Sequence, residues 1–229
     1  YMVHLGMVNK SDFQPTDDVK IMNFGNKITI LTGDFLLAKA SVGLSELENT
    51  EVVDIMAGII GDIVEGEALK DYKTLHNTGL VEWEEVIFKS QGSLFAKSCW
   101  ATLKLGFLSQ QYQDAGFAFG KNLALLQQVF KDYQELMTEL NTISLNNVAV
   151  IQNKHILPEN ILIKPVSTVI PADKNAKLKL QHSEITQKIK DLANCYGDKA
   201  LESLEQFPSS EARVCLENLV SYLMLLQNK

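Results

Sequence analysis

Apolar residues recur at intervals of three and four along most of the chain, which is typical of helices with one buried face. The pattern predicts helical regions at residues 21–67, at about 83–140 with a break near 110–115, and at 182–206. A last helix is predicted at 211–226, because the Pro-Ser-Ser sequence before it is a common helix start. The sequence therefore predicts an all-α protein.

Two segments interrupt the helical pattern. The sequence "LHNTGL" between the first two helical regions has the composition of a loop. Residues from about 144 to 181 carry three prolines and many β-branched residues without a sustained helical period. We expect a single helical domain over residues 1–229, with an irregular connection at about 144–181.

The composition excludes several classes of protein. The formal net charge of -7 and the absence of a basic cluster argue against a nucleic-acid-binding surface. Three cysteines without a C-x-x-C pair suggest neither a disulfide framework nor a zinc knuckle. No window approaches about 18 uncharged apolar residues, so no membrane span is expected. The first residues are apolar and lack a helix cap, as expected for a fragment of a longer protein.

One predicted helix combines an apolar face with polar residues. In "FGKNLALLQQVFKDYQEL", residues 119–136, the polar residues Gln128, Asp132 and Glu135 lie on or beside the apolar face, and Lys131 is next to Asp132. Because buried polar groups cost free energy when unpaired, this pattern predicts either a polar cavity in a helical bundle or a solvated edge.

Two stretches carry a resemblance to a known family. The segment "FGNKITILTGDFLLAKA" at 24–40 resembles the F-G-N-K-x-A-I-L-x-G-D-[FY]-L-L-A-x-A stretch of the trans-isoprenyl diphosphate synthases. The "FGKNLALLQQVFKD" segment matches a second family motif, and "GDIVEGE" and "GSLFAKSC" lie between the two in the family's order. The resemblance implies an all-α, isoprenoid synthase-type helical bundle. The family's N-terminal helices have no counterpart, so we expect this chain to lack them.

The chemistry of this family implies what the site should contain. Ionisation of an allylic diphosphate requires Mg²⁺ and basic side chains to stabilise the leaving pyrophosphate. The family holds Mg²⁺ with two aspartate-rich helices that face each other. In this chain Leu5 and Gly6 stand at the aspartate pair of the first motif, and Asn9 stands at its last aspartate. Leucine and glycine side chains cannot bind Mg²⁺.

The second motif and a basic position are also altered. Relative to the family pattern, Lys131 replaces the first aspartate, Asp132 keeps the second, and Glu135 replaces the last. Gln128, which the resemblance assigns to substrate binding, is retained. Ser90 occupies the position of a lysine that touches the diphosphate. We therefore expect no catalytic residues and no bound metal in this chain, with Gln128, Asp132 and Glu135 as vestiges.

Three functional hypotheses follow. The first is a catalytically degenerate subunit of a heteromeric all-trans polyprenyl diphosphate synthase that makes the ubiquinone side chain. Its partner would be an active subunit 1 that carries Mg²⁺. The two would form a heterotetramer in mitochondria, in peripheral association with the inner membrane. The second is a weakly active enzyme that uses Gln128, Asp132 and Glu135. The third is a helical interaction module without prenyl chemistry.

Aromatic residues at helical spacing predict a further feature. Phe88, Phe95, Trp100 and Phe107 are expected to belong to the core. The alternative, which follows from the resemblance, is that they form the wall of a polyisoprenoid tunnel.

Overall fold

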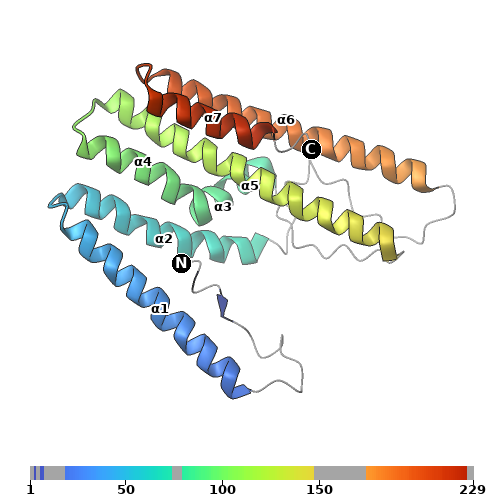
Figure 1. Cartoon of the computed structure of the whole chain (residues 1–229), viewed down its shortest axis with the longest axis horizontal. Helices are drawn as coiled ribbons and strands as arrows, with labels where there is room; N and C mark the ends of the chain where they lie inside the picture. The colour runs from blue at the N-terminus through green and yellow to red at the C-terminus, as the bar shows by residue number, and fades with distance from the viewer. Residues whose placement is uncertain (1–2, 4–5, 8–18, 74–78, 147–173, 226–229) are drawn as a thin grey trace. The chain divides into compact units, whose positions relative to one another are not determined.

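The computed structural model describes residues 3, 6–7, 19–73, 79–146 and 174–225. The longer elements in these residues are all helices, which confirms the all-α fold. Residues 1–53 and 54–229 form two compact units, which are described separately. The elements are α1 (Val19–Ser45), α2 (Thr50–Lys73), α3 (Leu80–Ile87), the π-helix η3 (Phe88–Gly92), α4 (Ser93–Leu105), α5 (Gln110–Asn146), α6 (Lys174–Glu205) and α7 (Glu211–Leu225) (Figure 1).

Several helix boundaries differ from the sequence prediction. The predicted region 21–67 is two helices, and Asn49 caps the second by accepting the Val52 N–H at 3.1 Å. The predicted break at 110–115 lies earlier, at 106–109, where Phe107 has a φ of 53°. Residues 174–181 are helical instead of irregular, because α6 begins at Lys174. The centre of the predicted connection, 147–173, lies outside the described residues.

The predicted start of the last helix is confirmed. The Ser210 hydroxyl oxygen accepts a hydrogen bond from the backbone N–H of Arg213 at 3.1 Å, as a helix-capping serine does. The Arg213 guanidinium donates to Glu217 at 2.6 Å and to the carbonyl oxygen of Phe207 at 2.7 Å. The bond to Phe207 attaches the first turn of α7 to the segment that connects it with α6.

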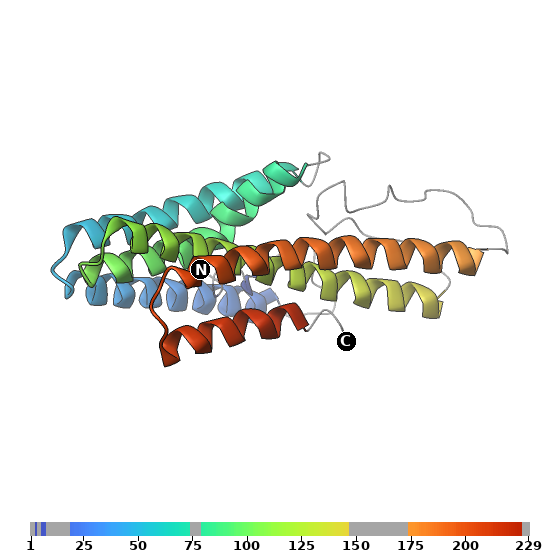
Figure 2. The ribbon, with the colours of Figure 1, turned by 90° about the horizontal axis from the view of Figure 1, so that it is seen from above.

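The core of the second unit is built around α5. This helix packs against α4 on one side and α6 on the other, and α7 packs on α6 (Figures 1 and 2). Trp83 of α3 stacks on Tyr196 of α6 with ring centroids 6.1 Å apart. The Tyr196 hydroxyl donates to Glu84 at 2.7 Å, and burial together with this bond raises the pKa of Tyr196. The core includes Trp83, Ile87, Phe119, Leu125, Leu126, Val129, Ile189, Ala193, Tyr196 and Val220.

The helices α4 and α5 approach closely at a glycine. A Cβ atom on Gly120 would lie 2.6 Å from the carbonyl oxygen of Phe95 and 2.7 Å from the Cα of Ala96. Such separations are far below normal van der Waals contact, so only a residue without a side chain allows this crossing. Gly120 thereby sets the distance between the two helices.

In the first unit, α1 exposes a regular apolar stripe. Met22 and Gly33 are buried. On another face, apolar residues repeat with alternating spacings of three and four, and all are exposed: Ile21, Phe24, Ile28, Leu31, Phe35, Ala38 and Val42. We call these seven residues the α1 stripe. Spacing of this kind is the pattern by which one helix packs along another.

The length and composition of α1 bear on the expectation that the chain has no membrane span. Among the described residues, one helix segment, Ile21–Ser45, is long and apolar enough to cross a membrane, and 6% of its most apolar 18-residue window is buried. The expectation of no span counted only windows without charges, whereas this helix contains Lys27, Asp34 and Lys39. Length and composition alone are weak support for a membrane span.

The predicted aromatic core is only partly correct. Phe88 and Trp100 are half-buried, and both lie near the ring of Phe117, with centroids 5.9 Å and 6.2 Å away. Phe107, however, is 92% exposed because it lies in the turn between α4 and α5, and Phe95 is 36% exposed. The fully buried aromatic residue of this region is Trp83, which the pattern of spacing did not single out.

Candidate functional site

The second unit contains a buried chain of polar side chains on α5. The Gln128 amide nitrogen donates to the Asp132 carboxylate at 2.6 Å, and the two residues are 7% and 4% exposed. The Gln128 amide oxygen in turn accepts from the amide nitrogen of Gln91 in η3 at 2.9 Å. We call these three residues the amide–carboxylate chain. Its two bonds pair the Gln128 amide and the Asp132 Oδ1 atom, which would otherwise be costly to bury.

The two outer positions of the same motif face solvent. Lys131 and Glu135 are exposed, although each lies within one turn of the buried Asp132. The structure therefore places one carboxylate of this motif inside the protein and the other outside it. A divalent cation such as Mg²⁺ needs several oxygen ligands that converge, which this arrangement does not provide.

The altered basic position lies in the π-helix. Ser90 is 1% exposed, and its hydroxyl has no hydrogen-bond partner among the described residues. The neighbouring Lys89 binds Glu65 of α2 and lies 3.8 Å from Glu85 of α3. The hydrogen bond with Glu65 raises the pKa of Lys89. Lys89 is thus paired with carboxylates of this chain.

A π-helix contains one extra residue compared with an α-helix, and such turns are frequent at functional sites. In this protein the extra residue turns the segment from Phe88 to Gly92 so that Lys89 faces α2 while Gln91 faces α5. Gln91 was not predicted as a site residue. Its only sequence signal is its position next to Ser90.

The first motif belongs to the other compact unit. Gly6 is exposed, and its N–H donates to the carbonyl oxygen of Val3 at 3.0 Å. Leu5 and Asn9 lie outside the described residues. Glycine has no side chain to bind a metal ion, as the sequence already indicates.

The described residues of the second motif do not provide converging ligands for Mg²⁺. Within the described residues no group of three or more His, Cys, Asp or Glu side chains is arranged to hold a metal ion. One carboxylate oxygen of Asp132, Oδ1, accepts a hydrogen bond from the Gln128 amide at 2.6 Å, and the preceding residue of the motif is the exposed Lys131. A cation at this place would compete with the Gln128 amide for Asp132 and would meet no second buried carboxylate of this motif, since Glu135 is exposed.

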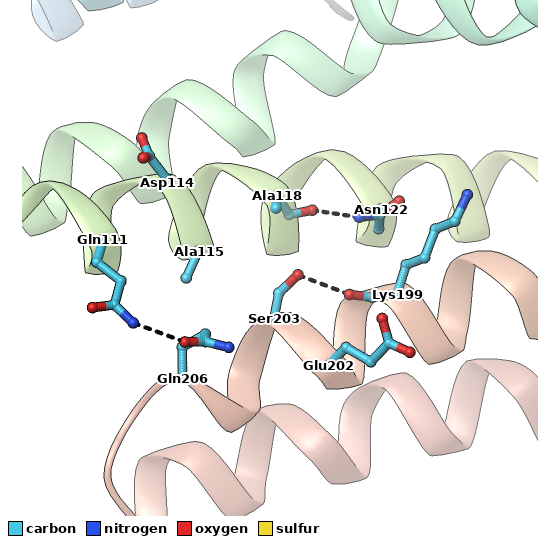
Figure 3. A pocket seen from close by; sticks show the side chains of 9 residues that line it. All are labelled: Gln111, Asp114, Ala115, Ala118, Asn122, Lys199, Glu202, Ser203 and Gln206. Atoms are coloured by element: carbon cyan, nitrogen blue, oxygen red, sulfur yellow. Dashed lines mark hydrogen bonds between the residues drawn. The ribbon is translucent and has the colours of Figure 1, made fainter.

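A separate groove lies between the first half of α5 and the second half of α6. Its volume is about 430 Å³, and it is open to solvent. Figure 3 shows Gln111 of α5 donating to Gln206, which directly follows α6, at one end of the groove, with Asn122 and Lys199 toward the other; the Gln111–Gln206 hydrogen bond is 3.0 Å long. The lining combines Lys199 with the carboxylates of Asp114 and Glu202. This mixed charge does not suit a diphosphate, whose binding needs an excess of positive groups.

The helical bundle, with one motif on α1 and a second, altered motif on α5, defines an isoprenoid synthase-type protein. A family model described as "Polyprenyl synthetase" matches residues 14–149, which is more than half of the chain. The chain belongs to this family.

The curated relatives agree. The chain is 36% identical over 238 residues to the human "All trans-polyprenyl-diphosphate synthase PDSS2", a match that covers 96% of this chain and 58% of the relative. It is 30% identical to a "Probable hexaprenyl pyrophosphate synthase, mitochondrial" of Neurospora crassa, covering 93% of this chain and 51% of that protein. The chain therefore spans little more than half the length of these relatives.

Solved structures support the fold. The crystal structure of a decaprenyl diphosphate synthase from Rhodobacter capsulatus superposes with a TM-score of 0.67 at 18% identity. The match covers 97% of this chain and 72% of that structure. At this level of identity the similarity establishes the isoprenoid synthase-type fold, which confirms the fold class predicted from the sequence.

Proposed function

We propose that this chain is a catalytically degenerate subunit of a heteromeric all-trans polyprenyl diphosphate synthase. In this proposal an active subunit of the same fold elongates an allylic diphosphate with isopentenyl diphosphate to make the ubiquinone side chain. The aspartate-rich helices of the active subunit hold Mg²⁺ and perform the chemistry. The present chain supports that subunit. The names of the relatives, a PDSS2 protein and a mitochondrial hexaprenyl synthase, support both the product class and a mitochondrial location.

One observation carries the proposal. The amide–carboxylate chain engages Asp132 internally, whereas Lys131 and Glu135 of the same motif face solvent. An active motif would present its carboxylates together toward the diphosphate and its metal ions. The buried Ser90 at the position of the family's lysine favours the same conclusion.

The α1 stripe favours a helical partner. Its exposed residues have the spacing of one side of a helix–helix seam, and burial of such residues stabilises association by about 25 cal/mol per Å² of apolar surface. We propose that a second subunit of the isoprenoid synthase fold covers this stripe, in a heterotetramer with two copies of each subunit. A second copy of this chain would satisfy the same spacing and is an outcome that the test below distinguishes.

Co-expression tests the proposal. This chain, a candidate catalytic subunit, and the two together are purified and supplied with Mg²⁺, an allylic diphosphate and isopentenyl diphosphate, and products are separated by chain length. We expect no elongation by this chain alone. The elongation rate of the pair should exceed the summed rates of the two subunits measured separately by at least about tenfold, because an incomplete subunit adds activity only through its partner.

The other hypotheses give different results in this experiment. Turnover by the purified chain alone, lost on replacing Asp132 with alanine, would establish a weakly active enzyme and overturn the proposal. Failure of any synthase to copurify would favour an interaction module without prenyl chemistry. Size measurement of the purified chain identifies self-association as the alternative cover for the α1 stripe.

A further inference from the structure

The amide–carboxylate chain connects two helices that are far apart in the sequence. Gln91 belongs to η3, while Gln128 and Asp132 belong to α5. Each bond fixes the orientation of the next, because the Gln128 amide donates with its nitrogen and accepts with its oxygen. The Gln91–Gln128 bond joins η3 to α5, and the Gln128–Asp132 bond fixes the Gln128 amide in the orientation that this joint needs.

The same π-helix also holds α2. A Cβ atom at Gly66 would overlap the backbone of Ser90, so the two segments cross with almost no space between them. Lys89 binds Glu65, and Lys97 of α4 binds Asp62 at 2.6 Å. One face of α2, formed by Asp62, Glu65 and Gly66, is therefore attached to η3 and to the start of α4.

The opposite face of α2 is apolar and uncovered. Ile60 is 48% exposed and Val64 is 66% exposed, and the residues beside them on this face are also exposed: Ala57, Gly61 and Ala68. The position of this face depends on where the attached face is held. A helix that packs on one side only has its outer side placed by that packing.

We propose that Gln91, Gln128 and Asp132 form a brace that fixes η3 and, through η3, sets the position of α2. Residues that belong to a metal motif in the family thus hold the exposed α2 face in place in this chain. That this face serves a partner subunit rests on the proposed function. The brace itself is a property of the single chain and can be tested without a partner.

Hydrogen exchange on the purified protein tests the brace. Replacing Gln128 with leucine removes both bonds, so amide exchange in residues 58–68 of α2 and in η3 should accelerate by about tenfold. The matched control is Gln187→Leu. Gln187 donates to Asp191 four residues later at 2.8 Å, with the same chemistry and spacing but on the exposed side of α6. This control should leave exchange in α2 unchanged.

A conservative replacement separates the brace from a metal-binding role. In Asp132→Asn an amide oxygen can still accept the Gln128 bond, so exchange in α2 should stay within about twofold of the wild-type protein. In Asp132→Leu the acceptor is lost, and exchange should accelerate as in Gln128→Leu. Gln91→Ala, in η3, removes only the hydrogen bond between η3 and α5. It should accelerate exchange in α2 and η3 as Gln128→Leu does.

Three results would overturn the proposal. The first is equal exchange in α2 for Gln128→Leu and the control, and the second is acceleration by Asp132→Asn as large as that by Asp132→Leu. Acceleration spread equally over α5, α6 and α7 would indicate general destabilisation in place of a brace. If the brace passes these tests but no partner subunit binds, the proposed function fails and the brace stands.

Discussion

Replacing Leu31 with glutamate is expected to abolish assembly with the catalytic subunit. Leu31 lies in the middle of the α1 stripe and is 53% exposed in the single chain. A buried, unpaired carboxylate in an apolar helix seam opposes association, and the loss of one central apolar contact adds to this cost. Together these two costs should raise the dissociation constant of the two subunits by at least about 100-fold. Titration of the purified subunits, followed by size and turnover, measures the effect.

The matched control for this substitution is Leu36→Glu. Leu36 lies on the same helix and is similarly exposed at 51%, but it is outside the α1 stripe. We expect the dissociation constant of the Leu36→Glu variant and the catalytic subunit to change by less than about threefold. Equal effects of the two substitutions would contradict the assignment of the stripe as the docking face. Circular dichroism of both variants shows whether the single chain keeps its helices.

Replacing Gly120 with alanine is expected to destabilise the second unit by about 2–3 kcal/mol. The added methyl group would lie 2.6 Å from the Phe95 carbonyl oxygen, so α4 or α5 must move. The higher helix propensity of alanine offsets only about 1 kcal/mol of this cost. Urea unfolding followed by circular dichroism measures the free energy of unfolding.

Gly61→Ala provides the opposite expectation. A Cβ atom at Gly61 has no neighbour within 4 Å, so the substitution keeps the packing and gains helix propensity. Its free energy of unfolding should rise by up to about 1 kcal/mol. If both substitutions change stability in the same direction and by the same amount, the close approach at Gly120 does not determine the distance between α4 and α5.

The periodicity of the sequence predicts helices well and their surroundings poorly. Capping residues such as Ser210 are local signals, and the start of α7 follows directly from them. The α1 stripe is just as periodic as the buried face of a core helix, yet it is exposed in the single chain. Spacing predicts that a face will be covered, but it does not predict which molecule covers it. For the same reason Phe107 was expected in the core but lies in an exposed turn.

The candidate site illustrates a second limit of prediction from the sequence. The family motif locates Gln128 and Asp132, but it cannot tell whether the carboxylate faces a metal ion or an amide, since both need the same residue type. The bond from Gln91 depends on the π-helix, and a single extra residue in a helix leaves no mark in composition or periodicity. The interaction of Lys89 with Glu65 joins residues of two helices and is equally invisible in a local pattern.

The most direct test of the central claim is the turnover of the assembled pair when this chain carries Asp132→Asn and Glu135→Gln together. These changes remove both remaining carboxylates of the motif but keep an acceptor for Gln128. If the chemistry belongs to the partner, the rate of elongation should stay within about twofold of the unmodified pair. A fall of about 100-fold or more with assembly intact would mean that this chain binds the metal, and would contradict the account.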